Sequence, residues 1–413
     1  MRYAATGIKL AICLASLSAG PAFTQTQSDE AIPDTTASAP VAYVYVQTSS
    51  GVNLYDAASN GSLTLVKGSP FKTVGEMIGS NGKFFITLGT DYVHSYAIES
   101  NGAIGKQVSE INSLDYTGGE TIFLNYAGLD HTGQNLSVIV EYGSALAFQS
   151  FDIAKASGAL TFKGSLVLDN SLYCIPPLFP SITANDKFYY WSGYNGGVFE
   201  CGAPGPLAAF TRGSDGVLQV LDIRETDPTP WPNYQWILNS VAADATNHLA
   251  VVLYGYDGYT KYQQNRNVQL ASYTEDAEGN LVSTNTYEDM PVPLVGPDII
   301  RMSPSGKLLA VAGNFDPSDF SQPVQGLQIF HFNGAKPITP YSNVISTANF
   351  GQSSLHWDNN NHLYALGSPT KGTYQLFVYT ITPTSISEAP GSPYTIKANW
   401  TELSTNSLVV VPK

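Results

Sequence analysis

Two residues in the last third of the sequence have side chains that could do chemistry together. Arg301 and His356 each stand five residues before a turn glycine or its equivalent, in segments that we expect to be equivalent strands. A guanidinium can hold an anionic group or an oxyanion, and an imidazole can act as a general base on water. Together the two groups could catalyse a hydrolysis. The alternative is that Arg301 pairs with Asp298 and that His356 packs beside Trp357.

A second group of candidate residues is aromatic and lies in two loops, 231–236 and 254–266. Flat apolar rings with hydrogen-bonding tips suit the binding of sugars. The same rings could simply pack the long loops onto the strands, because tyrosine is abundant throughout this chain. With Asp298, the candidate ligand-binding residues are Trp231, Trp236, Tyr256, Asp257, Tyr259, Tyr262 and Arg266.

Cysteine usage and motif searches limit the chemistry further. Cys174 and Cys201 are the cysteines that remain after a leader is removed, and in an exported protein we expect them to form a disulfide. Two free buried thiols are the alternative. No zinc-binding pattern, metalloprotease motif, phosphate-binding loop or dinucleotide-binding fingerprint is present. We therefore predict neither a metal nor a cofactor.

An internal repeat must position these residues. A turn, followed by an apolar strand and then an alternating strand, recurs six times, with turns at 80–83, 131–134, 184–187, 245–248, 303–307 and 359–362. Asp130, Asp244, Asp358 and Ser303 share one place beside these turns, which indicates turn capping.

The repeat predicts an all-β fold, a seven-bladed β-propeller of four-stranded blades over residues 41–413. The first unit, 41–71, lacks a leading strand, whereas 407–411 form a strand with no unit after it. Pairing this last strand into the first blade closes the ring and removes exposed edges. Two β-sandwiches are the alternative. For the six blades that contain a repeated turn, counting five residues back from the turn glycine or its equivalent gives the inner-strand residue expected in the channel: Met77, Gly128, Ser181, Ala242, Arg301 and His356.

The long loops all fall on one face of this propeller. They surround the fourth, fifth and sixth blades, at 171–180, 192–206, 224–237, 254–267, 288–297 and 314–326. Because loops carry function on rigid β scaffolds, we expect the site above these blades and the channel mouth.

Composition and the N-terminus indicate the compartment and exclude some partners. The formal charge is −14 with only 19 Lys and Arg, so nucleic acid is not an expected partner. Residues 1–22 have the charged, apolar and small-residue order of a secretory signal, and 23–40 read as a disordered linker. We predict an exported, periplasmic or extracellular monomer with no membrane contact after cleavage.

Four segments resemble a known family: GSLTLVKGSPF at 61–71, GALTF at 158–162, SPSGKLLAVAG at 303–313 and ISEAPGSPYTI at 386–396. They are similar to lactonase-type seven-bladed propellers, the group that includes 6-phosphogluconolactonase-like proteins. The resemblance spans nearly all of 41–413, and it implies hydrolysis of a sugar or related lactone. Ile299 and Ser354 stand where this family carries histidines. A non-catalytic propeller that binds a glycan or a protein through the aromatic loops is the alternative.

Overall fold

The computed structural model describes residues 39–116, 122–142, 145–169, 177–193, 208–221, 235–256, 268–297, 299–313, 325–370, 373–397 and 407–413. They belong to one compact unit, Ala39–Lys413. The predicted signal, and the predicted linker up to residue 38, lie outside these ranges. Within them, no helix is long and apolar enough to cross a membrane.

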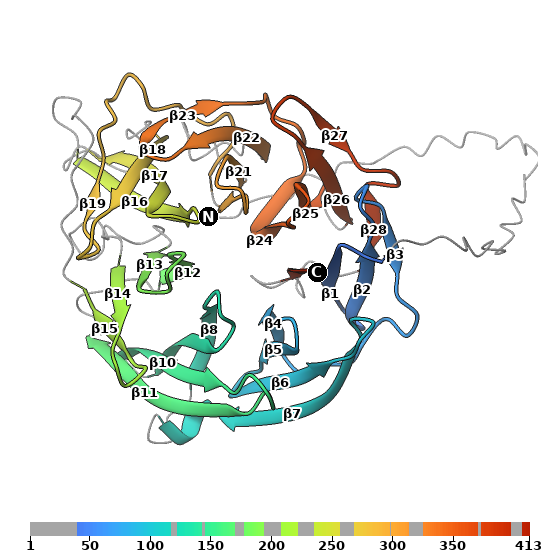
Figure 1. The fold of residues 1–413 in the computed structure, drawn as a ribbon. Helices are drawn as coiled ribbons and strands as arrows, with labels where there is room; N and C mark the ends of the chain where they lie inside the picture. Colours follow the sequence, from blue (N-terminus) through green and yellow to red (C-terminus); the bar gives the residue numbers. More distant parts are fainter. Residues whose placement is uncertain are drawn as a thin grey trace, which may run out of the picture. The chain divides into compact units, whose positions relative to one another are not determined.

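Seven antiparallel sheets follow one another around a ring, and each sheet runs from the centre outward (Figure 1). The prediction of an all-β, seven-bladed propeller is confirmed. The helical element of the described residues is a single 3-10 turn, η1 (Ser113–Tyr116), after the second blade.

The first four blades are built in chain order apart from the innermost strand of blade 1. Blade 1 consists of β29 (Leu408–Pro412), β1 (Ala42–Thr48), β2 (Gly51–Ala57) and β3 (Leu63–Leu65). Blade 2 consists of β4 (Glu76–Ser80), β5 (Phe84–Leu88), β6 (Tyr92–Ile98) and β7 (Ile104–Asn112). Blade 3 consists of β8 (Ile122–Leu129), β9 (Asn135–Tyr142), β10 (Ala145–Ile153) and β11 (Leu160–Asp169). Blade 4 consists of β12 (Pro177–Ile182), β13 (Phe188–Gly193), β14 (Ala208–Arg212) and β15 (Leu218–Val220).

The last three blades repeat the same order. Blade 5 consists of β16 (Gln235–Ala243), β17 (His248–Tyr256), β18 (Val268–Glu275) and β19 (Leu281–Val282). Blade 6 consists of β20 (Ile299–Met302), β21 (Leu308–Gly313), β22 (Gly326–Asn333) and β23 (Lys336–Pro340). Blade 7 consists of β24 (Asn349–Trp357), β25 (His362–Ser368), β26 (Tyr374–Ile381) and β27 (Ile386–Glu388), and β28 (Tyr394–Ile396) also pairs with β26.

The ring is closed by the C-terminal strand, as predicted. β29 pairs with β1 in antiparallel register, from Ala42 opposite Pro412 to Val46 opposite Leu408. The next residue continues the ladder, because the backbone N–H of Lys413 donates to the carbonyl of Val41 at 2.9 Å. This pairing gives β1 hydrogen-bonding partners on both sides, so β1 is not an edge strand and β29 completes the four-stranded blade.

Removing residues 408–413 should leave β1 with an unpaired edge. We expect the truncated chain to melt at a lower temperature and to self-associate through that edge. Thermal melting and light scattering after size exclusion measure both effects. A synthetic peptide of residues 407–413 should reverse the self-association; a truncated chain that associates no more than the full one and melts like it would contradict the closure.

The hydrophobic core is divided among the junctions between neighbouring blades. Second strands such as β5, β21 and β25 are buried along their whole length, and outer strands such as β3 and β15 are mostly exposed. Each of the seven buried clusters takes residues from two adjacent blades. The continuous apolar runs of the second strands follow from this burial on both faces.

Glycines in the turns between third and fourth strands bring neighbouring blades into close contact. These glycines have φ between 61° and 88°, a conformation that residues with a Cβ adopt at a cost. Five of them lie against a residue at the start of the second strand in the preceding blade: Gly61 against His362, Gly102 against Tyr43, Gly158 against Phe84, Gly279 against Phe188, and Gly334 against His248. A side chain at any of these positions would separate two blades.

Two glycines allow the inter-blade contact to be tested apart from backbone strain. Gly82 and Gly102 both follow Ser-Asn and have φ of 82° and 81°. A Cβ at Gly82 meets nothing within 4 Å, whereas one at Gly102 would lie 2.7 Å from the ring of Tyr43. We expect Gly102→Ala to lose about 1–3 kcal/mol more stability than Gly82→Ala, as overpacked cores do. Urea unfolding of the two variants measures the difference, and equal losses would contradict this role of Gly102.

The turn-capping prediction is confirmed at all four positions. A carboxylate oxygen of Asp130 accepts from the backbone N–H of Gln134, and Asp244 and Asp358 accept from N–H groups of their own turns. The hydroxyl of Ser303 accepts from the N–H of Leu308 at 3.0 Å. These side chains fix the turns that connect the innermost strands to the second strands.

Candidate functional site

Arg301 and His356 occupy the same register position on neighbouring innermost strands. Arg301 on β20 lies opposite Ala310, and His356 on β24 lies opposite Tyr364. Ala310 and Tyr364 are each the third residue of their strand. The innermost strands surround the centre of the ring (Figure 1), so the two candidate catalytic residues belong to one site there.

The structure corrects one member of the predicted ring of inner residues. In blade 2 the residue opposite the third position of β5, Ile86, is Gly79 rather than Met77. The prediction was wrong because this turn is two residues shorter than that of blade 6: Asn81 bonds to Phe84, whereas Ser303 bonds to Leu308. Met77 is fully buried. The other blades keep the predicted register and place Gly128, Ser181 and Ala242 at this position.

Side chains at this position are directed toward the following blade. The Oγ of Ser181 accepts from the backbone N–H of Ala243 in blade 5 at 3.2 Å. A Cβ at Gly79 would lie 3.6 Å from the side chain of Leu129 in blade 3. By the same geometry Arg301 is directed toward blade 7, where His356 lies.

Local contacts hold Arg301 without neutralising it. One guanidinium nitrogen donates to the carbonyl of Ile300 at 3.0 Å, and the indole N–H of Trp357 donates to the carbonyl of Arg301 at 3.2 Å. No carboxylate among the described residues lies within ion-pair distance of this guanidinium. Asp298, the partner considered from the sequence, lies outside the described residues. The ring of Trp357 is buried between blades 6 and 7, in a cluster that does not include His356.

The surroundings favour the neutral form of His356. Both His356 and Arg301 keep partial solvent exposure although protein surrounds them, as expected near the centre of a ring. Desolvation and, to a smaller extent, the neighbouring positive charge of Arg301 together lower the pKa of His356 to about 3. Desolvation also lowers the pKa of Arg301 to about 10, so the guanidinium stays charged at neutral pH. The site therefore combines a cation with a neutral imidazole.

This electrostatic coupling predicts the titration of His356. Replacing Arg301 with Gln removes the positive charge, so the pKa of His356 should rise. Arg212→Gln is the matched control, because Arg212 stacks on Tyr189 in blade 4 and should leave His356 unchanged. Histidine ring NMR signals followed against pH measure both. An unchanged His356 in Arg301→Gln would show that the two groups do not interact.

Most of the candidate ligand-binding residues, and both cysteines, lie outside the described residues. They include Trp231, Asp257, Tyr259, Tyr262, Arg266, Cys174 and Cys201. Trp236 and Tyr256 belong to β16 and β17, where their backbones pair through Gln235–Tyr256 and Trp236–Gly255, but their side chains are not described. The aromatic site and the disulfide thus remain predictions.

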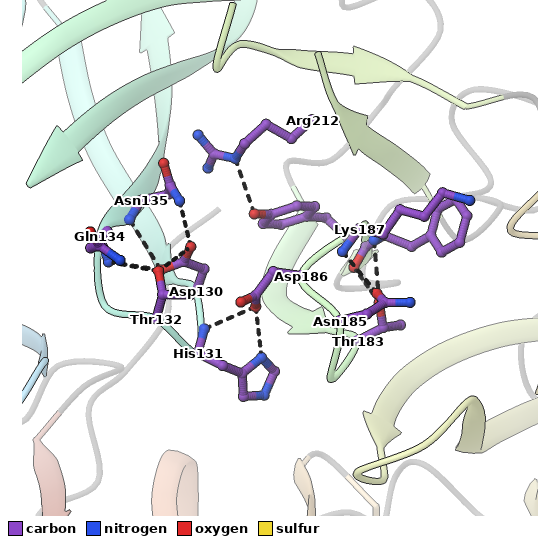
Figure 2. A network of polar contacts seen from close by, with 12 residues as sticks. Asp130, His131, Thr132, Gln134, Asn135, Thr183, Asn185, Asp186, Lys187 and Arg212 are labelled. Atoms are coloured by element: carbon purple, nitrogen blue, oxygen red, sulfur yellow. Dashed lines mark hydrogen bonds and ion pairs between the residues drawn. The ribbon is translucent and has the colours of Figure 1, made fainter. Parts of the chain in front are cut away.

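A second polar cluster ties the inner turns of blades 3 and 4 together (Figure 2). The backbone N–H and Nδ1 of His131 both lie within 2.9 Å of one carboxylate oxygen of Asp186. Beside them Asp130 accepts four hydrogen bonds from its own turn. The Nε–H of Arg212 donates to the hydroxyl of Tyr189 at 3.2 Å. This cluster joins turns between blades.

A third polar group is buried in blade 7. Nδ1 of His362 lies 2.7 Å from a carboxylate oxygen of Asp358, and the hydroxyl of Tyr364 donates to the same oxygen at 2.9 Å. These hydrogen bonds lower the pKa of Asp358 although burial alone would raise it. At 0–1% exposure, the three side chains have no access to a substrate, so they stabilise the blade. Among the described residues, no three His, Cys, Asp or Glu side chains converge as metal ligands.

Comparisons with known proteins leave the activity open. No protein-family model matches the chain, and no curated protein matches it in sequence. A solved structure of a protein from Lactobacillus plantarum is 13% identical with a TM-score of 0.42, covering 90% of this chain and 98% of its own. Saccharomyces cerevisiae Sqt1 is 13% identical with a TM-score of 0.45, covering 88% and 90%. Prolyl oligopeptidase B from Galerina marginata is 10% identical with a TM-score of 0.45, covering 77% of this chain and 43% of its own. At this level of similarity none of them informs the site.

Sequence reasoning missed one buried titratable residue outside the ring centre. Glu275, the last residue of β18, is 3% exposed and lies beside Tyr190 of blade 4. A signal was present in the sequence, because the equivalent strands end on apolar residues such as Ile153 and Ile381. A lone carboxylate at an apolar position of a repeat indicates a special environment.

Proposed function

We propose that this protein is a lactone hydrolase that acts at the centre of the ring on a sugar or related lactone. The observation that carries the proposal is the pair formed by Arg301 and His356, a cation beside a neutral imidazole at one register position of adjacent inner strands. The resemblance of the 61–71, 303–313 and 386–396 segments to lactonase-type propellers supports it. Export from the cytoplasm, which residues 1–22 predict, is part of the proposal.

In this proposal Arg301 binds the acyl oxygen of the lactone. When water adds to the carbonyl carbon, the oxygen becomes negatively charged, and a guanidinium held in place beforehand stabilises that charge. The ester bond of the ring then breaks, and the product is a hydroxy acid. Its carboxylate remains attracted to Arg301 until release.

His356 accepts a proton from the attacking water and returns it to the departing ring oxygen. A base with a low pKa is weak in the free protein. The developing oxyanion offsets the positive charge of Arg301, which is one of the two causes that lower the pKa of His356. The imidazole thus becomes more basic as the reaction proceeds, at the stage where it must hold the proton.

Proton release in a pH-stat from a panel of sugar lactones tests the proposal. We expect turnover above the spontaneous rate in the wild type and a loss of at least about 100-fold in His356→Ala, as is typical when a general base is removed. Arg301→Gln should fall by a similar factor. His331→Ala serves as the control, because this histidine lies on β22 against Tyr341 and away from the inner strand.

The outcomes separate the two functions considered from the sequence. Activity that survives in both variants would place catalysis elsewhere. No turnover by the folded wild type on any lactone would reject the hydrolase. Binding of a glycan or protein through the 231–266 loops would then be the function to test, with Trp231→Ala and Tyr259→Ala.

A further inference from the structure

Glu275 stands at a position that is apolar in other blades. The backbone N–H of this position donates to the carbonyl of the last residue of the inner turn in five blades. The residues that make this bond are Ile98, Ile153, Phe332, Ile381 and Glu275. In blade 5 alone among these five, a carboxyl group takes the place of an aliphatic or aromatic side chain. Glu275 is 3% exposed, and its carboxyl group lies beside the hydroxyl of Tyr190 in blade 4.

The hydroxyl of Tyr190 has two oxygen neighbours and only one proton. Its oxygen lies 2.8 Å from the carbonyl of Gly279 and 3.1 Å from Oε2 of Glu275. A hydroxyl can donate to one of them, and the carbonyl of Gly279 can only accept. Which group donates between Tyr190 and Glu275 therefore depends on whether the Tyr190 hydroxyl proton points to Gly279 or to Glu275.

An equivalent tyrosine in blade 1 indicates the direction. Tyr45 occupies the same place in its blade, and its hydroxyl donates to the carbonyl of the turn glycine Gly102 at 2.7 Å, with Ile98 in place of the acid. The bond between tyrosine and turn glycine is thus a repeated feature that needs no carboxyl group. With the Tyr190 proton on Gly279, a charged Glu275 would face the lone pairs of the Tyr190 oxygen.

We infer that Glu275 is a neutral carboxylic acid in the folded protein, and that its proton completes a hydrogen-bonded chain from Glu275 through Tyr190 to Gly279. This chain crosses the junction between blades 4 and 5. The junction is therefore a pH-sensitive contact that is complete when Glu275 is protonated and loses a hydrogen bond when the carboxyl group ionises. The inference is independent of the function proposed for Arg301 and His356.

The charged groups around Glu275 are accounted for on each packed element. Lys187, the residue before β13, donates to the carbonyl of Ala277 and lies over the ring of Phe188. In the turn after β18, Asp276 and Glu278 are exposed. On β17, His248 contacts Asp244. β19 carries no titratable residue. None of these groups is paired with the Glu275 carboxyl group.

Burial raises the pKa of Glu275 to about 7, although the charge of Lys187 and a hydrogen bond donated by Tyr190 would each lower it. The sign of the stability effect follows. In the unfolded chain this group loses its proton near the ordinary glutamate pKa of 4.5, while the folded chain keeps it until about pH 7. The folded state binds more protons between these values, so stability falls as pH rises through this window and levels off above it.

Urea unfolding at several pH values tests the inference with Glu275→Gln, which keeps the shape and cannot ionise. The stability of Glu275→Gln relative to wild type should increase between about pH 4.5 and 7 and stay constant above. Glu278→Gln is the matched control, an exposed carboxylate three residues away, and its difference from wild type should stay flat. A flat profile for Glu275→Gln would overturn the inference.

Infrared spectroscopy gives a readout that stability alone does not. A protonated-carboxyl stretching band should be present in the wild type at pH 6, absent in Glu275→Gln, and titrate with a midpoint near pH 7. If Glu275→Gln does not fold, Tyr190→Phe replaces it: loss of the acceptor should shift the band to higher frequency. A wild type without such a band at pH 6, or a band that Tyr190→Phe leaves unmoved, would show that Glu275 is not the acid of this chain.

Discussion

No blade of this protein can bury its own apolar surface, and the fold depends on burial between neighbouring blades. Each junction has its own buried cluster, and each blade contributes to two of them. A ring satisfies this constraint only if the last junction also forms. β29 supplies the inner strand of blade 1, which brings blades 7 and 1 together around Tyr364 and Val44. Pairing of β29 with β1 therefore stabilises the junction between blades 7 and 1, which is built mainly from other strands.

Much of the architecture could be predicted from the sequence because the repeat is local. Each turn and the strands beside it occupy adjacent residues, so their spacing is visible without the fold. The missing strand of the first unit and the extra strand at residues 407–411 indicated the closure for the same reason. The predicted register of blade 2 was wrong because counting back from the turn assumed a constant turn length, whereas the turn at Asn81 is shorter.

The site was predictable only in part. Arg301 and His356 could be assigned to equivalent positions by counting along two strands with regular turns. Their electrostatic state depends on desolvation in the folded protein and on the charge of Arg301 next to His356, which no local pattern reveals. Glu275 was missed for a related reason: its carboxyl group lies beside Tyr190 of another blade. Contacts between blades decide the chemistry of both places, whereas the repeat describes contacts within a blade.

The seven inner-strand positions in this register differ in charge, so the two sides of the ring centre are not equivalent. In register with Arg301 and His356, the other blades present Gly79, Gly128, Ser181 and Ala242, with Val409 of β29 opposite Tyr45. All five are small or uncharged. A fold with nearly sevenfold symmetry thus carries its charge at this level on one side only. A molecule with one anionic end would enter such a centre in a single orientation, with that end toward blades 6 and 7, so the asymmetry would select a pose before any specific contact forms.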